Sequence, residues 1–135
     1  MRQATAWLLI AAASASPAAL AYTPQVNFQL QCMGCHRLDG SGEEGRVPSV
    51  RSTLVPFAML AEGREYVIRV PGVAQSTLSD EDTAALLNWM ARHLSNVPLP
   101  AGFADFTAAE VARSRHQPLP AVKEARARLL ESVAR

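Results

Sequence analysis

Near the start of this chain of 135 residues stands the motif Cys32-Met33-Gly34-Cys35-His36, which contains both of the cysteines in the sequence. On a helical turn, two thiols at this spacing project to one side, and an imidazole follows directly after the second. Covalent attachment of haem c requires this arrangement, because the thiols add across two vinyl groups while the imidazole meets the iron. The motif therefore predicts one covalently bound haem c, with His36 as the proximal iron ligand.

Other uses of the two cysteines fit the sequence less well. A thioredoxin-like dithiol favours a βαβ context, whereas the flanking segments have helical patterns. A zinc site takes about four ligands; Cys32, Cys35 and one of His93 or His116 supply three, and a fourth is hard to name. Export to an oxidising compartment would also allow a disulfide between the two cysteines, but it would close only a very small loop.

Residues 1–21 have the features of a secretory signal peptide. Arg2 gives a positive start, Ala4 to Ala13 forms a short apolar stretch, and Ala19-Leu20-Ala21 fits the small-x-small cleavage rule. The apolar stretch is too short and too rich in alanine to span a bilayer well. We therefore expect cleavage after Ala21, a periplasmic location, and a mature chain without a membrane span.

The charge balance of the mature chain argues against a nucleic-acid partner. Arg2 is the only charged residue of the predicted signal, so the mature chain has 12 basic and 12 acidic residues. Nucleic-acid binding favours a basic stripe with interleaved aromatic residues, and none is visible. The 49% hydrophobic and 19% charged composition suits one globular unit. We expect a core domain over residues 22–97 and a C-terminal extension over residues 98–135.

The first half of the mature chain predicts one short helix and one weak one. Residues 25–35 suit a short helix that leads into the cysteine motif, and the glycine-rich segment 38–51 is expected to form a loop. Residues 58–70 are a weak helical candidate, broken at Gly63. Their best part, residues 64–70, could equally form a strand.

The strongest predicted helix follows Ser79. This serine is a natural N-cap, and Asp82 three residues later gives a near match to the capping box. Pro98 and Pro100 stop the helix. Its apolar stripe, at spacings of four residues, consists of Leu86, Met90 and Leu94.

The extension over residues 98–135 also predicts helices. Thr107 and Glu110 form a capping box before one short helix, and a basic helix follows Pro120. The apolar side of the basic helix consists of Val122, Ala125, Leu129 and Val133. We favour packing of this arm on the core over a role in docking a partner, since amphipathic helices usually bury against their own domain. The expected fold class is mainly α, a small helical haem domain with a helical C-terminal extension.

The chain resembles the small class I, monohaem c-type cytochromes over about residues 25–96. Residues 32–42 look like that family's haem motif and the glycine turn after it, and residues 46–50 look like its proline segment. This resemblance implies that Pro48 lies beside His36. Residues 78–90 look like the family's C-terminal helix, and Trp89 takes the place of the aromatic residue that packs near the N-terminal helix.

The sixth iron ligand is where this chain departs from the family. The family supplies a methionine on the loop before its last helix, and here that loop, residues 71–77, has none. Met59 is the best remaining thioether and is predicted as the second metal ligand, with a core position beside Phe57 as its alternative. Gln75 could offer a weak oxygen ligand, and an open, five-coordinate iron is a further alternative. Met90 is assigned to the core.

Electron transfer is the expected function. Histidine with methionine raises the reduction potential and favours outer-sphere electron transfer, and the sequence shows no obvious acid–base pair, so we do not expect an enzyme. The resemblance implies redox partners such as a periplasmic dehydrogenase or a terminal oxidase. The alternative is a haem enzyme or small-ligand-binding haem protein with an open or labile sixth coordination site.

Overall fold

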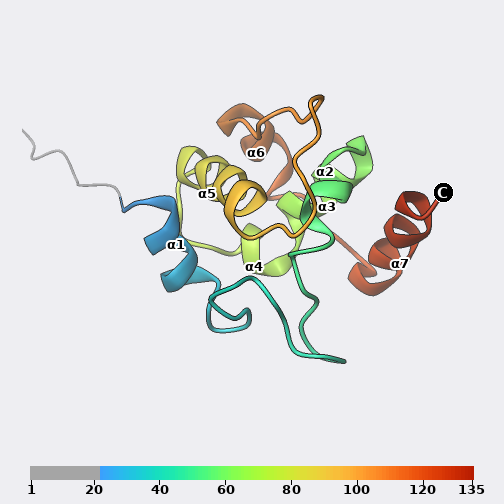
Figure 1. The fold of residues 1–135 in the computed structure, drawn as a ribbon. Coiled ribbons are helices and arrows are strands. Elements are labelled where there is room, and N and C mark those ends of the chain that lie inside the picture. The colour runs from blue at the N-terminus through green and yellow to red at the C-terminus, as the bar shows by residue number, and fades with distance from the viewer. Residues whose placement is uncertain (1–21) are drawn as a thin grey trace, which may run out of the picture.

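The computed structural model describes residues 22–135 and shows a mainly α fold (Figure 1). The predicted signal peptide and its cleavage site lie outside the described residues. Across residues 22–135 the regular elements are helices, with one isolated β-bridge between Glu43 and Val47. In chain order they are α1 Pro24–Gln31, α2 Leu54–Ala58, α3 Ala61–Arg69, α4 Pro71–Ala74, α5 Asp80–His93, α6 Ala108–Ser114 and α7 Val122–Val133. The fold class expected from the sequence is therefore confirmed. In this part of the chain, none of the helices has the length and hydropathy to cross a membrane.

Helix α1 packs against α5, so the first and last helices of the core are neighbours. The Thr23 side chain caps α1 by accepting a hydrogen bond from the backbone N–H of Val26. Phe28 is fully buried, and the centre of its ring lies 5.8 Å from that of Trp89. The position that the resemblance gave to Trp89, near the N-terminal helix, is confirmed.

Helix α5 follows its sequence prediction closely. The Ser79 hydroxyl accepts a 3.0 Å hydrogen bond from the backbone N–H of Asp82, which satisfies one of the free donors at the helix start. The predicted apolar stripe is buried, at Leu86, Met90 and Leu94. Burying each such side chain stabilises the fold by about 1.5–3 kcal/mol, so this helix is a principal support of the core.

In the segment before α5, the expected helix break at Gly63 is wrong, and the helix is the alternative observed for residues 64–69. Helix α3 is continuous through Gly63, and Tyr66 to Ile68 are helical rather than extended. A Cβ atom at residue 63 would lie 2.1 Å from the carbonyl oxygen of Phe57, so the glycine allows α3 to pass close to the end of α2. The absence of a side chain at Gly63 permits the close contact between α2 and α3. This contact outweighs the low helix propensity of glycine.

The expected loop over residues 71–77 is partly helical. Val70 is extended, with ψ 141°, and Pro71 then opens the single turn of α4. Proline disfavours a helical conformation in the residue before it but suits the first position of a helix. The proline therefore ends α3 and begins a new element that the sequence did not reveal.

Residues 38–51 form an irregular loop, as predicted, and a close backbone contact holds it together. The N–H of Glu43 donates to the carbonyl of Val47 at 2.9 Å, and the N–H of Val47 donates back at 2.8 Å. A Cβ atom at Gly42 would lie 1.8 Å from the same Val47 oxygen. Only glycine allows this closure, which fixes the segment that begins at Arg46 and contains Pro48.

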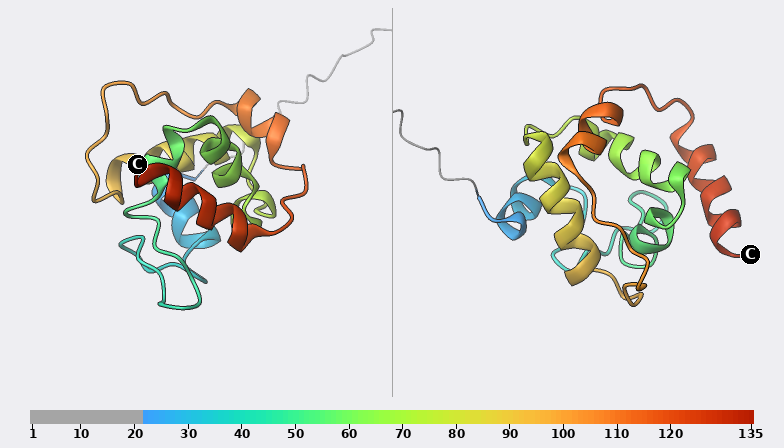
Figure 2. Two further views of the ribbon diagram at one scale, coloured as in Figure 1. Left: turned by 90° about the vertical axis from the view of Figure 1, so that its right-hand side faces the viewer. Right: turned by 90° about the horizontal axis from the view of Figure 1, so that it is seen from above.

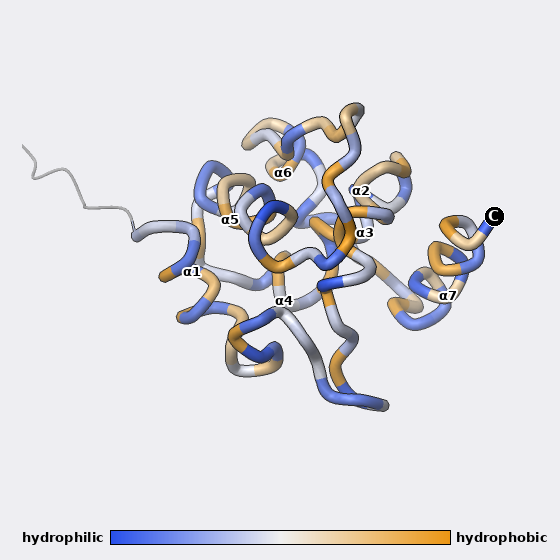
Figure 3. The backbone as a smooth tube through the Cα atoms, in the orientation of Figure 1, coloured by the Kyte–Doolittle hydropathy of each residue, from blue (hydrophilic) through white to orange (hydrophobic). Residues whose placement is uncertain are grey.

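The extension packs on the core, the arrangement that the sequence favoured. Phe106, Val111 and Leu129 are buried in one hydrophobic cluster with residues of α1, α2, α3 and α5. The Asn88 side chain of α5 accepts a hydrogen bond from the N–H of Phe106 and donates one to its carbonyl, at 2.8 and 2.9 Å. Figure 2 shows the extension running back over the core and ending in α7, along which hydrophobic and hydrophilic residues alternate in Figure 3.

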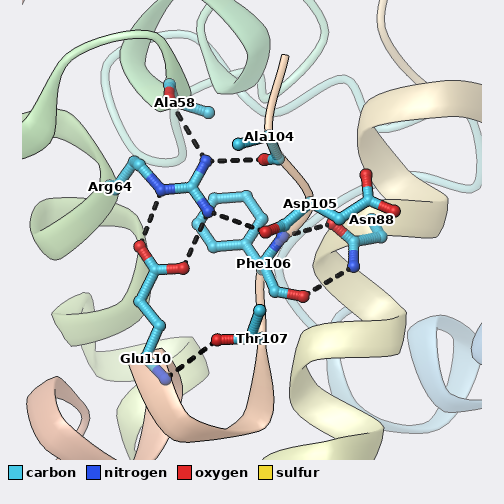
Figure 4. Close-up of polar contacts among 8 residues, drawn as sticks. All are labelled: Ala58, Arg64, Asn88, Ala104, Asp105, Phe106, Thr107 and Glu110. Carbon is cyan, nitrogen blue, oxygen red and sulfur yellow. Dashed lines mark hydrogen bonds and ion pairs between the residues drawn. The ribbon is translucent and has the colours of Figure 1, made fainter.

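The guanidinium of Arg64 joins α3 to the extension (Figure 4). It donates two hydrogen bonds to the Glu110 carboxylate, at 2.6 and 2.7 Å, and one to the carbonyl of Ala104 at 2.8 Å. It also lies 4.1 Å from the centre of the Phe106 ring. The predicted capping box forms by half: the Thr107 hydroxyl accepts from the Glu110 N–H, while the Glu110 carboxylate is turned to Arg64.

This ion pair predicts a pH-dependent contribution to stability. Hydrogen bonding from Arg64 holds the pKa of the Glu110 carboxyl below its ordinary value of 4.5, although burial partly opposes the shift. A carboxyl with a lowered pKa in the folded state stabilises the fold fully above its unfolded-state pKa, and the contribution is lost as the pH falls through the folded-state value. We therefore expect Glu110→Gln to reduce the free energy of unfolding at neutral pH, and the difference from wild type to shrink below pH 4.5.

Urea unfolding of both forms across this pH range measures the difference. Glu131→Gln, at an exposed carboxylate of α7, is the matched control and should change little. A difference between wild type and Glu110→Gln that stays constant with pH would show that the ion pair does not titrate as described.

The start of α7 contains a strained residue. Ala121 has φ 54° and ψ 51°, a left-handed conformation that costs an L-residue with a side chain roughly 1–2 kcal/mol. Glycine adopts it freely. We expect Ala121→Gly to raise the free energy of unfolding by about 1 kcal/mol, whereas Ala127→Gly inside α7 should lower it by about the same amount. Denaturant unfolding checks both, and a loss of stability in both variants would contradict the assignment of strain.

Candidate haem site

A cavity of about 340 Å³ opens between the turn after α1, the loop before α2, and helices α3 to α5. This volume lies within the range of about 300–1,000 Å³ that is usual for ligand sites. Its walls are mostly apolar and include Val50, Leu54, Phe57, Val67, Leu86 and Leu87. Such a lining suits a large hydrophobic group and excludes water from it.

The cysteine motif forms a helical turn at the edge of this cavity. Helix α1 ends at Gln31, and the carbonyl of Cys32 then accepts hydrogen bonds from the N–H groups of Cys35 and His36, at 3.1 and 2.9 Å. All three side chains line the cavity, and both cysteines are free thiols. The structure thus brings together the three residues that the sequence predicted as thioether and iron ligands.

Burial shifts the pKa values of Cys32 and His36 in this turn. The pKa of the Cys32 thiol is raised to about 11, mainly by burial and further by the neighbouring Cys35. Burial also lowers the pKa of His36, so its imidazole is neutral at neutral pH and offers a lone pair to a metal. Within residues 22–135, the His36 Nδ1 atom is buried without a hydrogen-bond partner. Two free thiols, a neutral imidazole and an apolar cavity are the donor set and the space that haem c requires.

Pro48 lies in the wall of the same cavity as His36. The segment around it is held by the N–H of Val50, which donates to the carbonyl of Gly40 at 3.0 Å. The resemblance placed this proline beside the histidine, and the structure brings both to one cavity, although no hydrogen bond from His36 Nδ1 forms within the described residues.

Met59 is not brought to the cavity. It is the residue that follows α2, and its side chain is 44% exposed. Its neighbours Phe57 and Ala58 occupy the buried side of that short helix, so the next position along the turn faces outward. The alternative of a core position for Met59 is wrong for the same reason. Gln75 also lies outside the lining.

Met90 is buried, as predicted, and it is the methionine among the residues that line the cavity. The sequence assigned it to the core stripe of α5, and that assignment is confirmed. Its place in the cavity wall could not be read from helical periodicity, because burial against a neighbouring helix and burial against a cofactor give the same pattern.

The sequence did not reveal that the extension contributes to this cavity. Val122 and Arg126 of α7 lie in the cavity wall, together with Tyr66 of α3. The left view of Figure 2 shows α7 lying across the front of the core. A basic amphipathic helix was the only available signal, and it indicated packing on the core without indicating where.

Comparisons with known proteins identify the family. No family model matches the chain. A protein named cytochrome c-552 from one strain of Thermus thermophilus is 32% identical over 119 residues, a match that covers 75% of this chain and 80% of that protein. A second cytochrome c-552 from Thermus thermophilus is 33% identical over 107 residues, covering 66% of this chain and 82% of its own. With the cysteine turn and its cavity, these matches show that the chain belongs to the monohaem c-type cytochromes, electron-transfer proteins that carry one covalently bound haem c.

Proposed function

We propose that this chain is exported through a signal peptide over residues 1–21 and acts in the periplasm as a one-electron carrier. Cys32 and Cys35 would tether the haem, and His36 would be its proximal ligand. The observation that carries this proposal is the helical turn that presents all three side chains to one apolar cavity. The chemistry that the haem supplies is a reversible change between ferric and ferrous iron.

The residues of the chain support this role by shielding the iron. The hydrophobic shell around a redox metal limits access of solvent and helps to set the reduction potential. Leu86, Leu87 and Phe57 are almost completely buried in the cavity wall. We propose that the core over residues 22–97 provides most of this shell and that the extension over residues 98–135 closes it.

The proposed partners are redox proteins, a dehydrogenase that supplies the electron and an oxidase or other acceptor that receives it. Exposed apolar side chains around the cysteine turn support a docking role for this face. Leu30, Met33 and Leu38 are 61%, 40% and 56% exposed. Weak, transient electron-transfer complexes use small contact areas, and these three residues are close in sequence to Cys32, Cys35 and His36, which line the cavity.

The visible spectrum of the mature protein, produced with a cytochrome c maturation system, tests the proposal. We expect covalently bound haem with a spectrum that changes reversibly on addition of reductant and oxidant, and rapid exchange with a soluble redox protein in stopped-flow mixing. A product without covalent haem, or with haem that is not reduced and reoxidised reversibly, would contradict the role of carrier.

The cavity also supports a second candidate function, the binding of small ligands at an open or labile sixth position. The specific observation is that Met59 lies outside the cavity and that the segment of residues 71–77 contains no methionine. Addition of carbon monoxide to the reduced protein, or of azide to the oxidised one, separates the two functions. Rapid, complete binding favours an open site, and resistance to both ligands favours a closed electron carrier.

Variants of the two methionines identify the sixth ligand. We expect Met59→Leu to leave the ferric spectrum unchanged, because the Met59 side chain lies outside the cavity. Met90→Leu keeps the volume of the core but removes the thioether in the wall, and it is the matched comparison. The far-red charge-transfer band of ferric haem with bound methionine is the measurement. Loss of that band in Met59→Leu alone would restore Met59 as the ligand.

A further inference from the structure

Arg115, the residue that caps the C-terminal end of α6, places a positive charge inside the fold. Its side chain is 4% exposed, and arginine is rarely buried to this degree unless it is paired. Within residues 22–135 its acidic partner is Asp80, at 3.1 Å, and the Asp80 side chain is 32% exposed. Solvent and salt screen the charge of this carboxylate more than that of the buried guanidinium. The pair therefore leaves part of the positive charge uncompensated.

The other hydrogen bonds of this guanidinium go to neutral groups. It donates to the carbonyl of Leu78 at 2.8 Å, and to the carbonyl and the hydroxyl of Ser76 at 2.9 and 3.1 Å. Its Nε atom is buried and has no hydrogen-bond partner in the described part of the chain. A buried donor without a partner costs stability, and a redox role is one of the reasons for which proteins keep such a group.

The charge lies directly behind the wall of the haem cavity. Ser76, whose hydroxyl accepts from Arg115, lines that cavity. Val73 lines it too, and its carbonyl oxygen is 3.4 Å from the guanidinium. Arg115 itself is not one of the lining residues. One layer of residues therefore separates the charge from the space that the haem requires.

A positive charge in this position favours the ferrous state of a haem in the cavity. Ferric haem carries one more positive charge than ferrous haem, so a neighbouring cation destabilises the ferric state more. The lining of the cavity is mostly apolar, and charges inside a protein are screened far less than charges in water. The effect can therefore cross a single layer of residues, and it raises the reduction potential.

We propose that Arg115 raises the reduction potential of the haem from behind the cavity wall, and that Asp80 partly offsets this effect. The proposal rests on the one-electron transfer of the proposed function and adds a residue that adjusts its driving force. Arg115 belongs to the extension over residues 98–135. The extension thus adjusts the potential of a haem that is tethered to the core.

The test is a spectroelectrochemical titration of the holoprotein at neutral pH. Arg115→Gln removes the positive charge and should lower the reduction potential. The expected change is roughly tenfold in the ratio of ferrous to ferric haem at a fixed electrode potential, which equals about 59 mV for one electron. Asp80→Asn removes the offsetting negative charge and should raise the potential by a smaller amount, because this carboxylate is partly exposed.

Urea unfolding of the same variants separates the charge from the packing. Both substitutions disrupt one buried ion pair, so both should lower the free energy of unfolding. Their effects on the potential should nevertheless have opposite signs, which a loosened cavity wall cannot produce. Arg115→Lys keeps the charge without the planar fork. It should lose stability yet keep most of the potential, and with Asp80→Asn it preserves the test if Arg115→Gln fails to fold.

Arg113→Gln and Glu81→Gln are the matched controls, at exposed positions of α6 and α5, and each should change the potential little. Shifts of the same sign in Arg115→Gln and Asp80→Asn overturn the proposal. Potentials in these two variants that equal those of the controls also overturn it. Wild-type protein without covalent haem, or with haem that does not titrate reversibly, would instead overturn the proposed function.

Discussion

Replacement of both Cys32 and Cys35 with alanine is expected to abolish covalent attachment of haem. Cys32 and Cys35 are the two cysteines of the sequence. Both have free thiols, and both line the same cavity. Without them no thioether bond can form. A haem stain of the protein after denaturing electrophoresis measures this directly, and we expect the signal to fall to background. Each single variant keeps one thiol and should retain part of the signal.

Met33→Ala is the matched control, because this exposed residue stands between the two cysteines and does not line the cavity. Its haem content should equal that of the wild type. The double variant should also melt at a lower temperature than the holoprotein, since it lacks the tethered ligand that stabilises the fold by binding and leaves about 340 Å³ of apolar cavity without its covalent occupant. Covalent haem in the double variant would show that another residue anchors it.

The second large effect is expected for Arg115, a buried arginine at the end of α6. Its guanidinium donates to the carbonyls of Leu78 and Ser76, at 2.8 and 2.9 Å, and lies 3.1 Å from the Asp80 carboxylate. The side chain is only 4% exposed. Removal of one partner from a buried charged network typically costs about 3–5 kcal/mol. We expect Arg115→Ala to lower the free energy of unfolding by about 3 kcal/mol, measured by urea denaturation.

Arg113→Ala is the control for this substitution, since Arg113 is exposed two residues earlier on α6 and should matter by less than about 0.5 kcal/mol. The same variants test a link to the haem site. Ser76 accepts a hydrogen bond from Arg115 and also lines the cavity, so Arg115→Ala should alter the visible spectrum as well as the stability. Equal stability of the two variants would show that the buried network contributes little.

Arg115 also explains why the extension matters to the haem side of the molecule. The segment that it holds, between α4 and α5, lies in the loop where the family resemblance led us to expect a methionine, and here that segment contains none. Instead, a residue from the extension fixes its backbone, and α7 contributes to the cavity wall.

The parts of the fold that the sequence predicted well are those specified by local chemistry. The N-cap at Ser79 and the apolar stripe of α5 were identified from residues within one helix, and the N-cap at Thr107 likewise. The errors fall where a contact with another helix decides. Helix propensity alone predicts a break at Gly63. The residue nevertheless lies inside α3, because the carbonyl of Phe57 occupies the space that a side chain would need. The Glu110 carboxylate pairs with Arg64, 46 positions earlier in the chain, instead of completing the capping box.

For the candidate site, the sequence by itself determined the cofactor and the three residues that would hold it. Their chemistry depends on spacing along a single turn, from Cys32 to His36, and spacing is visible in one dimension. The tertiary structure alone decided the rest of the cavity. In the structure Met59 lies at the surface and Met90 lies in the cavity wall. Arg126 of the last helix lines the same cavity as the cysteine turn. The reason is physical: these positions follow from how helices bury their apolar faces against one another, and many pairings of the same faces agree with one sequence pattern.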